Sequence, residues 1–331
     1  MDVLSNHIVL EVDLVLITKE LLWNKYNISE EQIENCGLSL EELNGIENDF
    51  REYKYNKYLD IMKEFIEHYL ENTEVAKIHS YRARVKDPEH LAVKIIRKKQ
   101  SNYKKYKRLN ENNYEKFVTD LIGIRCFILF KSEWENFHQF VLSHFENNVE
   151  YYIKDCISDF DEDEEHNYIA EKPKVHIRSG DVRDIYEKIL SPDCVVDDKI
   201  YRSVHYILKY KGVYLEIQVR TLFEEGWGEV DHAIRYPNYQ ADPVFKEYTE
   251  LLNRLSGLAD EMGSFFNKLE SLELEYLKKK RPDTDIVTAE EYKKDASIVV
   301  ELKKRNQVKT EDNMLESDCT PNDCVQSVLN E

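Results

Sequence analysis

The segment GVYLEIQVRT, residues 212–221, constrains the fold more than any other part of the chain. Its side chains alternate between apolar and polar, so a β-strand would place them on two opposite faces of a sheet. The apolar face carries Leu215, Ile217 and Val219, and the polar face carries Glu216, Gln218 and Arg220. The apolar face predicts a core strand, and the polar face predicts the lining of a cleft. An ordinary solvent-exposed sheet face would show the same pattern and is the alternative.

The neighbouring segments predict a sheet with helices on its faces. Strand patterns occur at residues 117–130, 173–181, 201–211 and 212–221, the last two joined as a hairpin across Lys211 and Gly212. Helical spacing marks residues 134–145 and 222–236. Because strands and helices alternate and the hairpin comes late, we expect an α/β (mixed α+β) fold with a mixed β-sheet flanked by helices.

Composition divides the chain into four segments. Residues 1–75 predict an N-terminal helical region, and residues 76–240 contain the predicted sheet. Residues 241–282 predict C-terminal amphipathic helices, one or two in number, with an apolar stripe from Leu251 to Leu272. That stripe predicts either core packing or an interface between copies, so a homo-oligomer stays open. Residues 283–331 are charged and polar, which predicts a partly disordered tail.

Positive charge is concentrated in one window of an acidic protein. The formal net charge of the 331 residues is −19, which disfavours extended nucleic acid as a partner of the whole surface. Between Arg82 and Arg108, however, eleven basic residues face only Asp87 and Glu89, a local charge of +9. A solvated helix face is one explanation. We favour the other, a binding surface for a confined polyanion such as a nucleoside triphosphate.

The sequence predicts neither a membrane span nor a signal peptide. There is no run of 18 apolar residues, and the early apolar stretch lacks a basic region and a small-residue cleavage site. The six cysteines are scattered without a CxxC pair, which predicts reduced thiols in a cytoplasmic protein. P-loop, Rossmann, zincin and nucleophile-elbow motifs are absent from the sequence. If the protein binds phosphates, basic side chains and a metal must do so.

Two lone carboxylates lie within or beside predicted strands: Asp120 in VTDLIGIR and Glu216 in LEIQVRT. A buried carboxylate needs a cation beside it, and two of them on neighbouring strands could bind Mg²⁺ together with water and phosphate oxygens. The alternative is that each carboxylate pairs with an arginine, Asp120 with Arg125 and Glu216 with Arg220. Residue spacing does not decide between a metal site and arginine pairing. Asp120 and Arg125 differ by an odd number of residues, so we expect Asp120 to precede the strand.

Five segments in one order resemble the RelA/SpoT synthetase domain family: YRARVKDPEHL, VTDLIGIRCFILF, YRSVHYIL, LEIQVRT and EEGWGEVDHAIRYP. They lie within residues 79–240, and the resemblance is strongest to small, stand-alone alarmone synthetase-like proteins. It implies a nucleotidyltransferase-like mixed sheet. It also implies Mg²⁺-dependent transfer of the β,γ-pyrophosphate of ATP to the 3′-hydroxyl of GDP or GTP, which yields AMP and (p)ppGpp.

The resemblance also implies roles for single residues. Asp120 matches the metal-binding aspartate, and Glu216 matches the catalytic glutamate that positions or deprotonates the attacking hydroxyl and shares the metal. Tyr201 matches the tyrosine that stacks on the acceptor guanine, with Ser203 and His205 beside it. The other substrate-binding residues are Arg84, Lys86, Arg97 and Lys99 around the ATP phosphates, and Arg125, Gln218 and Arg220 in the cleft.

The chain departs from the family pattern at several positions. Ala83 and Ile200 stand where glycine is usual, and His90 stands where serine is usual. An insertion containing VHIRSGD precedes the tyrosine motif, and three of its basic side chains could touch phosphate from one strand face: Lys174, His176 and Arg178. Two alternative functions therefore stay open. One is transfer to the 3′ end of tRNA or to another nucleotide by a toxin or defence enzyme, and the other is a catalytically silent nucleotide sensor, which the intact Asp120 and Glu216 disfavour.

Overall fold

The computed structural model describes residues 16–71, 76–147, 167–178, 180–198, 202–235 and 242–280. The chain splits into two compact units, Met1–Ser264 and Phe265–Glu331. The sheet and all candidate residues belong to the first unit. The predictions for Ile200, Tyr201 and the tail at 283–331 lie outside the described residues.

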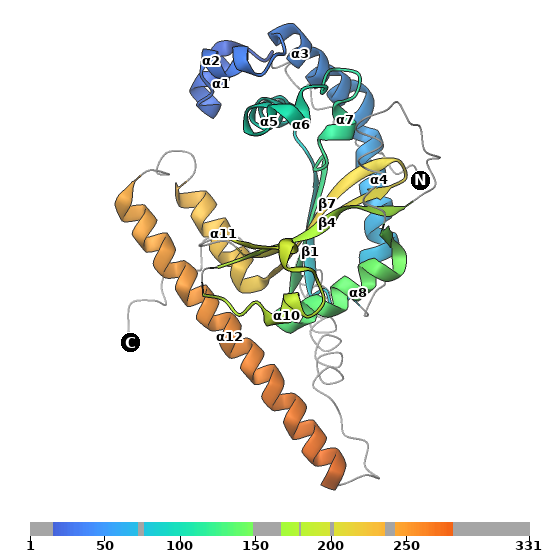
Figure 1. The fold of residues 1–331 in the computed structure, drawn as a ribbon, viewed down its shortest axis with the longest axis vertical. Coiled ribbons are helices and arrows are strands. Elements are labelled where there is room, and N and C mark those ends of the chain that lie inside the picture. The colour runs from blue at the N-terminus through green and yellow to red at the C-terminus, as the bar shows by residue number, and fades with distance from the viewer. Residues whose placement is uncertain are drawn as a thin grey trace, which may run out of the picture. The chain divides into compact units, whose positions relative to one another are not determined.

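A seven-stranded mixed sheet forms the core of the first unit (Figure 1). The strands are β1 (Ser80–Val85), β2 (Ile122–Ile128), β3 (Glu146–Asn147), β4 (Tyr168–Ile177), β5 (Val195–Asp197), β6 (Ser203–Tyr210) and β7 (Val213–Thr221). Their order is β1-β2-β7-β6-β4-β3, with β5 paired to β4. β2 and β7 are parallel, whereas β1–β2, β6–β7 and β4–β6 are antiparallel. The predicted mixed α/β class is confirmed.

The predicted hairpin is confirmed as the pair β6 and β7. Val204 lies opposite Val219 at one end of this pair, and Tyr210 lies opposite Val213 at the other. The turn residues have φ angles of 48° at Lys211 and 75° at Gly212. Two successive left-handed residues match the twist of an antiparallel pair, which is why Gly212 suits this position.

Helices flank the sheet (Figure 1). The α-helices are α1 (Lys19–Tyr26), α2 (Glu30–Asn35), α3 (Leu40–Asp49), α4 (Tyr55–Phe65), α5 (Pro88–Ser101), α6 (Tyr103–Tyr106), α7 (Tyr114–Phe117), α8 (Trp134–His144), α10 (Asp184–Glu187), α11 (Leu222–Arg235) and α12 (Pro243–Lys280). Single turns of π-helix, η1 (Phe50–Lys54) and η2 (Ile66–Leu70), flank α4, and the 3₁₀ turns are η3 (Lys131–Glu133) and η4 (Pro192–Cys194). The helices predicted at residues 134–145 and 222–236 and in the N-terminal region are confirmed, and the C-terminal pattern forms one helix.

The apolar face of the sheet packs against α4 and α8. The Phe65 ring lies 5.3 Å from that of Tyr210, centroid to centroid. The indole Nε1 of Trp134 donates a hydrogen bond of 3.1 Å to the Tyr206 hydroxyl. Both tyrosines belong to β6 and are buried. Since the even-numbered side chains of β6 enter this core, its odd-numbered side chains are left for the opposite face.

The N-terminal helices are fixed to α5 by a buried carboxylate. Glu89 lies in the first turn of α5 and accepts hydrogen bonds from the Tyr26 hydroxyl and from Lys25 Nζ, the latter at 2.8 Å. Both partners lie at the end of α1. The carboxylate also suits the N-terminus of α5, where the unpaired backbone N–H groups favour negative charge.

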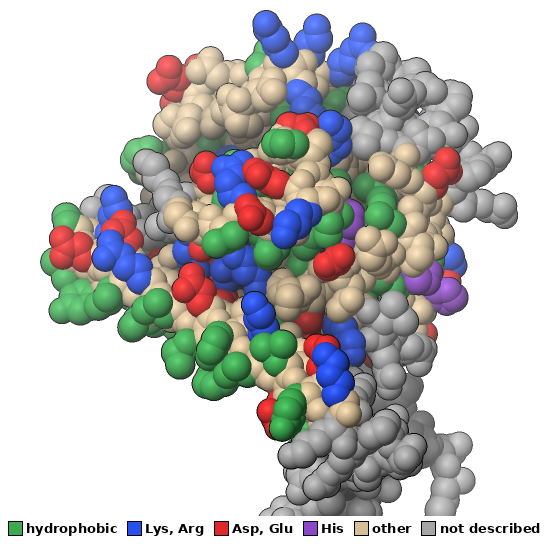
Figure 2. Space-filling model, turned by 60° about the horizontal axis from the view of Figure 1, so that its bottom comes forward, with side chains coloured by type: hydrophobic (Ala, Val, Ile, Leu, Met, Phe, Trp, Pro, Cys, Tyr) green, Lys and Arg blue, Asp and Glu red, His purple; other side chains and the backbone are tan. Residues whose placement is uncertain are grey.

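α12 buries its polar side and exposes its apolar side up to Ser264. The buried side carries Thr249, Asn253, Ser256 and Asp260, whereas Leu251, Leu255, Leu258 and Met262 are 52–59% exposed. The Ser256 hydroxyl donates to the Phe223 carbonyl oxygen at 2.7 Å, and Trp227 Nε1 donates to the Thr249 carbonyl oxygen at 2.9 Å. The interpretation of this stripe as a core-packing face is therefore wrong for residues up to Ser264, because its apolar side chains are exposed and the helix turns its polar side toward α11. Figure 2 shows the exposed apolar side chains along α12.

The described helices also bear on the predictions for membranes and thiols. Within the described ranges, no helix combines the length and apolar character needed to cross a membrane. Three cysteines fall within these ranges, Cys36, Cys126 and Cys194, and all three are buried free thiols. Burial raises the pKa of the Cys36 and Cys126 thiols, so both are held in the protonated, unreactive form.

Candidate functional site

The polar face of the sheet brings residues of five strands into two rows. Residues paired in register on neighbouring strands project their side chains from the same face of the sheet. One row runs through Arg82, Arg125, Gln218, His205 and Lys174. The next runs through Arg84, Gly123 and Glu216. Residues far apart in sequence therefore meet only because β2 and β7 are parallel neighbours at the middle of the sheet.

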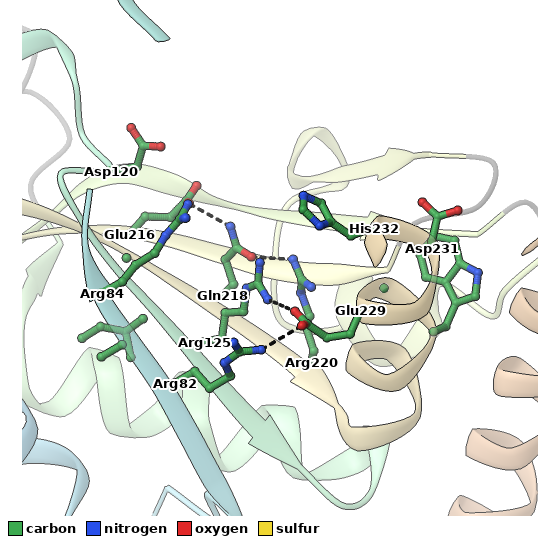
Figure 3. Close-up of a pocket in the computed structure, with 15 residues that line it drawn as sticks. Arg82, Arg84, Asp120, Arg125, Glu216, Gln218, Arg220, Glu229, Asp231 and His232 are labelled. Carbon is green, nitrogen blue, oxygen red and sulfur yellow. Dashed lines mark hydrogen bonds and ion pairs between the residues drawn. The ribbon is translucent and has the colours of Figure 1, made fainter. Parts of the chain in front are cut away.

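A cavity of about 520 Å³ lies over these rows, between the sheet and α11. Its lining includes Arg82, Arg84, Asp120, Gly123, Arg125, Glu216, Gln218, Arg220, Glu229, Asp231 and His232 (Figure 3). The polar side of β7 thus lines a cleft, as its alternation predicts. Gly123 faces the side chain of Arg84, and a Cβ at Gly123 would lie 3.9 Å from Arg84 Nε. The missing side chain keeps space open beside Glu216.

Asp120 lies in the turn before β2, as its parity predicts. Its Oδ2 atom is 2.9 Å from Lys86 Nζ and 3.2 Å from Lys94 Nζ. Its Oδ1 atom is buried and has no hydrogen-bond partner among the described residues. Burial alone would raise the pKa of Asp120, but Lys86, Lys94 and Lys98 outweigh it and lower the pKa to about 2. Asp120 is therefore an ionised carboxylate with one oxygen still available.

Glu216 is held through both of its oxygens. Its Oε1 atom is 3.4 Å from His205 Nδ1, and its Oε2 atom accepts a 2.8 Å hydrogen bond from Gln218 Nε2. Burial would raise the pKa of Glu216, but His205 and Gln218 outweigh burial and lower it. Glu216 is thus ionised and fixed in orientation beside the cavity.

The arginines expected to pair with these carboxylates bind elsewhere. Arg125 Nη1 lies 2.7 Å from Glu225 Oε1 and 2.8 Å from Glu229 Oε1. Arg220 Nη1 lies 2.9 Å from Glu225 Oε2, and its Nη2 donates to Gln218 Oε1 at 2.5 Å. The alternative of Asp120–Arg125 and Glu216–Arg220 pairs is therefore wrong, because α11 supplies its own carboxylates to both arginines.

Glu225 and Glu229 were not among the site residues predicted from the sequence. They stand four residues apart in EEGWGEVDH, on one side of α11, and this helical spacing was the signal available. Glu229 also pairs with Arg82, at 3.0 Å. Arg84, by contrast, makes no ion pair with any described residue. The cavity therefore contains a guanidinium free to bind an anion beside three that α11 holds in place.

A second, smaller cavity of about 150 Å³ lies beside Glu216. Its lining includes Lys98, Lys105, Tyr106, Thr119, Glu171, Lys172, Lys174, His205 and Glu216. Glu171 lies 3.3 Å from Lys105 Nζ and 3.6 Å from Lys174 Nζ. The lysines outnumber the carboxylates, so this cavity also favours an anion. Glu216 is shared by both cavities.

Four predicted residues line neither cavity: Lys86, which pairs with Asp120, and Arg97, Lys99 and Ser203. Arg97 Nη2 donates to the Tyr26 carbonyl oxygen at 3.4 Å. Lys99 is only 2% exposed, and burial lowers its pKa. Ser203 is buried and contacts Arg220 Nε at 3.4 Å without lining either cavity. Lys94 and Lys98 were not predicted as site residues. Lys94 pairs with Asp120 and Lys98 lines the second cavity, and the two share one face of α5 because they stand four residues apart.

The donor set for a metal is small. Among the described residues, no group of three or more His, Cys, Asp and Glu side chains could hold a metal ion. Asp120 and Glu216 line one cavity and supply two carboxylates. Such a pair suits Mg²⁺, which binds one or two protein carboxylates and takes its other ligands from water and phosphate.

Comparison with known proteins gives one family and several weakly similar structures. Residues 83–241 match the family model described as the region found in RelA / SpoT proteins. Small alarmone synthetase 1 from Bacillus subtilis bound to its product pppGpp is 15% identical, with a TM-score of 0.41, covering 66% of this chain and 97% of that chain. Small alarmone synthetase 2 from Bacillus subtilis is 21% identical, with a TM-score of 0.40 and coverage of 66% and 94%.

A GTP pyrophosphokinase family protein from Streptococcus pneumoniae is 18% identical, with a TM-score of 0.39 and coverage of 74% and 97%. None of the curated proteins matches the sequence. The family match includes the second half of β1, all of β2 and β7, both Asp120 and Glu216, and every lining residue of the first cavity except Arg82. Residues 83–241 of this chain therefore resemble the region found in RelA / SpoT proteins.

Proposed function

We propose that this protein transfers the β,γ-pyrophosphate of ATP to the 3′-hydroxyl of GDP or GTP and releases AMP. The single observation that carries the proposal is that Glu216 lines two anion-favouring cavities at once. Transfer between two nucleotides requires both to be held with their reacting atoms adjacent. A carboxylate between the two cavities suits the contact point between donor and acceptor.

The first cavity suits the donor. Its volume of about 520 Å³ lies within the usual range of ligand pockets, roughly 300–1,000 Å³. Arg84 has a free guanidinium there, and a guanidinium can bind phosphate oxygens in pairs or stack on a base. The second cavity, with Lys98, Lys105 and Lys174, suits the 5′-phosphates of an acceptor.

The proposed reaction is an in-line displacement at the β-phosphorus. The acceptor 3′-oxygen forms a bond to the β-phosphorus, and the bond from that phosphorus to the α,β-bridging oxygen breaks. AMP leaves with that oxygen, and the hydroxyl proton passes to Glu216. Because Glu216 is ionised and held through both oxygens, it can accept the proton without reorienting.

Asp120 and Glu216 are the residues that would hold Mg²⁺. The buried Oδ1 of Asp120, with no hydrogen-bond partner among the described residues, is the feature that fits a cation. When bound, Mg²⁺ neutralises charge on the transferring pyrophosphate. Lys86 and Lys94 hold the other oxygen of Asp120, so they fix this carboxylate for that task.

A second candidate acceptor is the 3′ end of tRNA. The observation in its favour is the exposed basic run beside the second cavity, formed by Lys104 in α6 and by Lys107 and Arg108 directly after that helix. A surface of this kind would contact more phosphates than one nucleotide offers. Its extent is short, so a nucleotide acceptor is the first candidate.

The test is a transfer assay with ATP labelled at the γ-phosphate. GDP, GTP, other nucleotides and bulk tRNA are offered separately with Mg²⁺. We expect label on GDP or GTP with the native protein and none with Glu216→Gln. Glu64→Gln is the matched control, because Glu64 pairs with Lys211 at the surface, away from both cavities, and its activity should be unchanged.

The other outcomes are equally distinct. Label on tRNA alone would mean that the acceptor is the 3′ end of tRNA and not GDP or GTP. If no acceptor gains label while calorimetry shows that ATP binds, the protein is a nucleotide sensor instead of an enzyme.

A further inference from the structure

His176 and Asp198 belong to the segment inserted before the tyrosine motif. β4 pairs with β6 so that Lys174 lies opposite His205 and His176 lies opposite Ser203. The side chain of His176 therefore projects from the same face of the sheet as Glu216, although neither cavity is lined by it. The His176 side chain is only 21% exposed, so most of its surface contacts other parts of the protein.

A line of contacts leads from Asp198 to Glu216. Asp198 Oδ2 lies 3.0 Å from His176 Nδ1. The ring of His176 packs against that of His205, with centroids 4.9 Å apart and planes inclined by 49°. His205 Nδ1 in turn lies 3.4 Å from Glu216 Oε1. The inserted segment thus reaches the proposed proton acceptor in three steps.

A matching line of contacts holds the other oxygen of Glu216. Gln218 donates to Oε2 at 2.8 Å, Arg220 donates to Gln218 at 2.5 Å, and Glu225 of α11 holds Arg220 at 2.9 Å. Each oxygen of Glu216 is therefore oriented by a side chain that a second side chain holds. On the Oε2 side the outer support comes from α11, and on the Oε1 side it comes from His176.

We infer that His176, held by Asp198, is a positioning residue that fixes the imidazole plane of His205 and so directs Nδ1 toward Glu216. The inference rests on the proposed function, because it takes Glu216 as the group that receives the proton. The packed ring restricts the side-chain torsions of the His205 imidazole, so removing it would loosen one contact that orients Glu216. Supporting groups of this kind restrict reactive geometry although they do not touch the substrate.

Steady-state kinetics test the inference first. His176→Ala should lower kcat about tenfold, the lower end of the loss seen when an outer supporting residue is removed. The KM for ATP should not change, because the first cavity keeps all its lining residues. His176→Phe keeps an aromatic ring against His205 and should restore most of the lost kcat.

A double-mutant comparison separates positioning from a general structural effect. If His176 acts through His205, the variant with both residues changed to alanine should have the kcat of His205→Ala alone. Losses that multiply, or a His176→Ala variant with native kcat, would overturn the inference. His144→Ala is the matched control: its ring packs against Phe140 at 4.6 Å, on α8 and away from both cavities.

A second measurement does not depend on activity. In proton–carbon NMR spectra, the His205 ring signal is identified by its loss in His205→Ala. We expect this signal to shift in His176→Ala and to stay in place in His144→Ala. A signal that does not move would overturn the inference even if the transfer assay succeeds, and a moving signal would sustain the contact even if the assay finds no transfer.

Discussion

Asp120 shows how one buried carboxylate serves both the fold and the site. Its partner Lys86 is nearly buried, with a side chain 7% exposed. Burial lowers the pKa of Lys86, and the adjacent carboxylate of Asp120 partly offsets this effect. Each charge is tolerated in the interior mainly because the other is present. Removing either side chain should therefore affect stability as well as activity.

The first prediction separates these two effects. Asp120→Asn should lower the free energy of unfolding by about 3 kcal/mol, because it leaves the Lys86 ammonium buried without its counter-charge. Adding Lys86→Met should recover most of that stability but no transfer activity. Urea denaturation and the transfer assay measure the two quantities. Asp60→Asn, which removes an exposed partner of Lys63, should change stability by less than about 1 kcal/mol.

The same residue predicts an acid-sensitive component of stability. The pKa of Asp120 is lowered from its ordinary value of 3.8 to about 2 in the folded protein. A lowered carboxylate pKa stabilises the fold above the unfolded pKa, and this contribution is lost as pH falls through the folded pKa. The difference in unfolding free energy between the native protein and Asp120→Asn should therefore shrink by about 2 kcal/mol from pH 4 to pH 2. A difference that stays constant over that range would contradict the assignment.

At the scale of elements, a buried ionic cluster within the first unit holds the part of α12 that ends at Ser264. Asp260 of α12 pairs with Arg202 and accepts a 3.0 Å hydrogen bond from the Thr221 hydroxyl. Arg178 crosses from the end of β4 to Glu224 at the start of α11. Buried charges of this kind are tolerated only when oppositely charged side chains lie within direct contact of one another. This requirement explains a glycine in the middle of the helix.

Gly257 leaves the space that Arg178 occupies. A Cβ at position 257 would lie 2.7 Å from Arg178 Nη1, whereas one at Gly263 would lie 3.7 Å from Phe130 Cδ1, an ordinary contact. Gly263→Ala should stabilise the protein by up to about 1 kcal/mol through helix propensity. Gly257→Ala should instead destabilise it by about 1 kcal/mol, since overpacking costs about 1–3 kcal/mol. Urea denaturation of both variants measures these changes in the free energy of unfolding. An equal increase in stability for both variants would contradict the prediction and show that Arg178 can move aside.

The elements also show where sequence patterns succeed. β2, β6 and β7 were predicted because their apolar side chains alternate or run continuously, and α8 and α11 because their apolar residues recur at helical spacing. β1 was not predicted, since SYRARV carries arginines at alternate positions and lies in a strongly basic window. Those arginines face the first cavity, so their charge reflects the site and not a solvated helix. β3 and β5, of two and three residues, are too short to leave a pattern.

For the whole molecule, the exposed apolar stripe of α12 bears on association between copies. Leu251, Leu255, Leu258 and Met262 recur at alternating spacings of four and three residues, and all are more than half exposed. Spacing of this kind is typical of a helix that packs against another helix. Self-association through this stripe stays a prediction.

Light scattering of the full chain measures the mass of the protein in solution and so tests self-association through the α12 stripe. We expect a mass above that of one chain for the native protein, and the mass of one chain for the variant Leu255→Lys/Leu258→Lys. Tyr53→Lys, which changes a side chain 77% exposed on the N-terminal helices, should leave the mass unchanged. A native protein with the mass of one chain would refute the prediction.

The sequence by itself determined the mixed α/β class, the polar and apolar sides of β7, and the placement of Asp120 before β2. It could do so because the periods of strands and helices are fixed by local backbone geometry. Only the tertiary structure decided that Lys86 and Lys94 hold Asp120, that α11 holds Arg125 and Arg220, and that α12 turns its polar side inward. Those contacts join segments far apart in sequence, and their choice depends on strand order, register and the packing of whole elements.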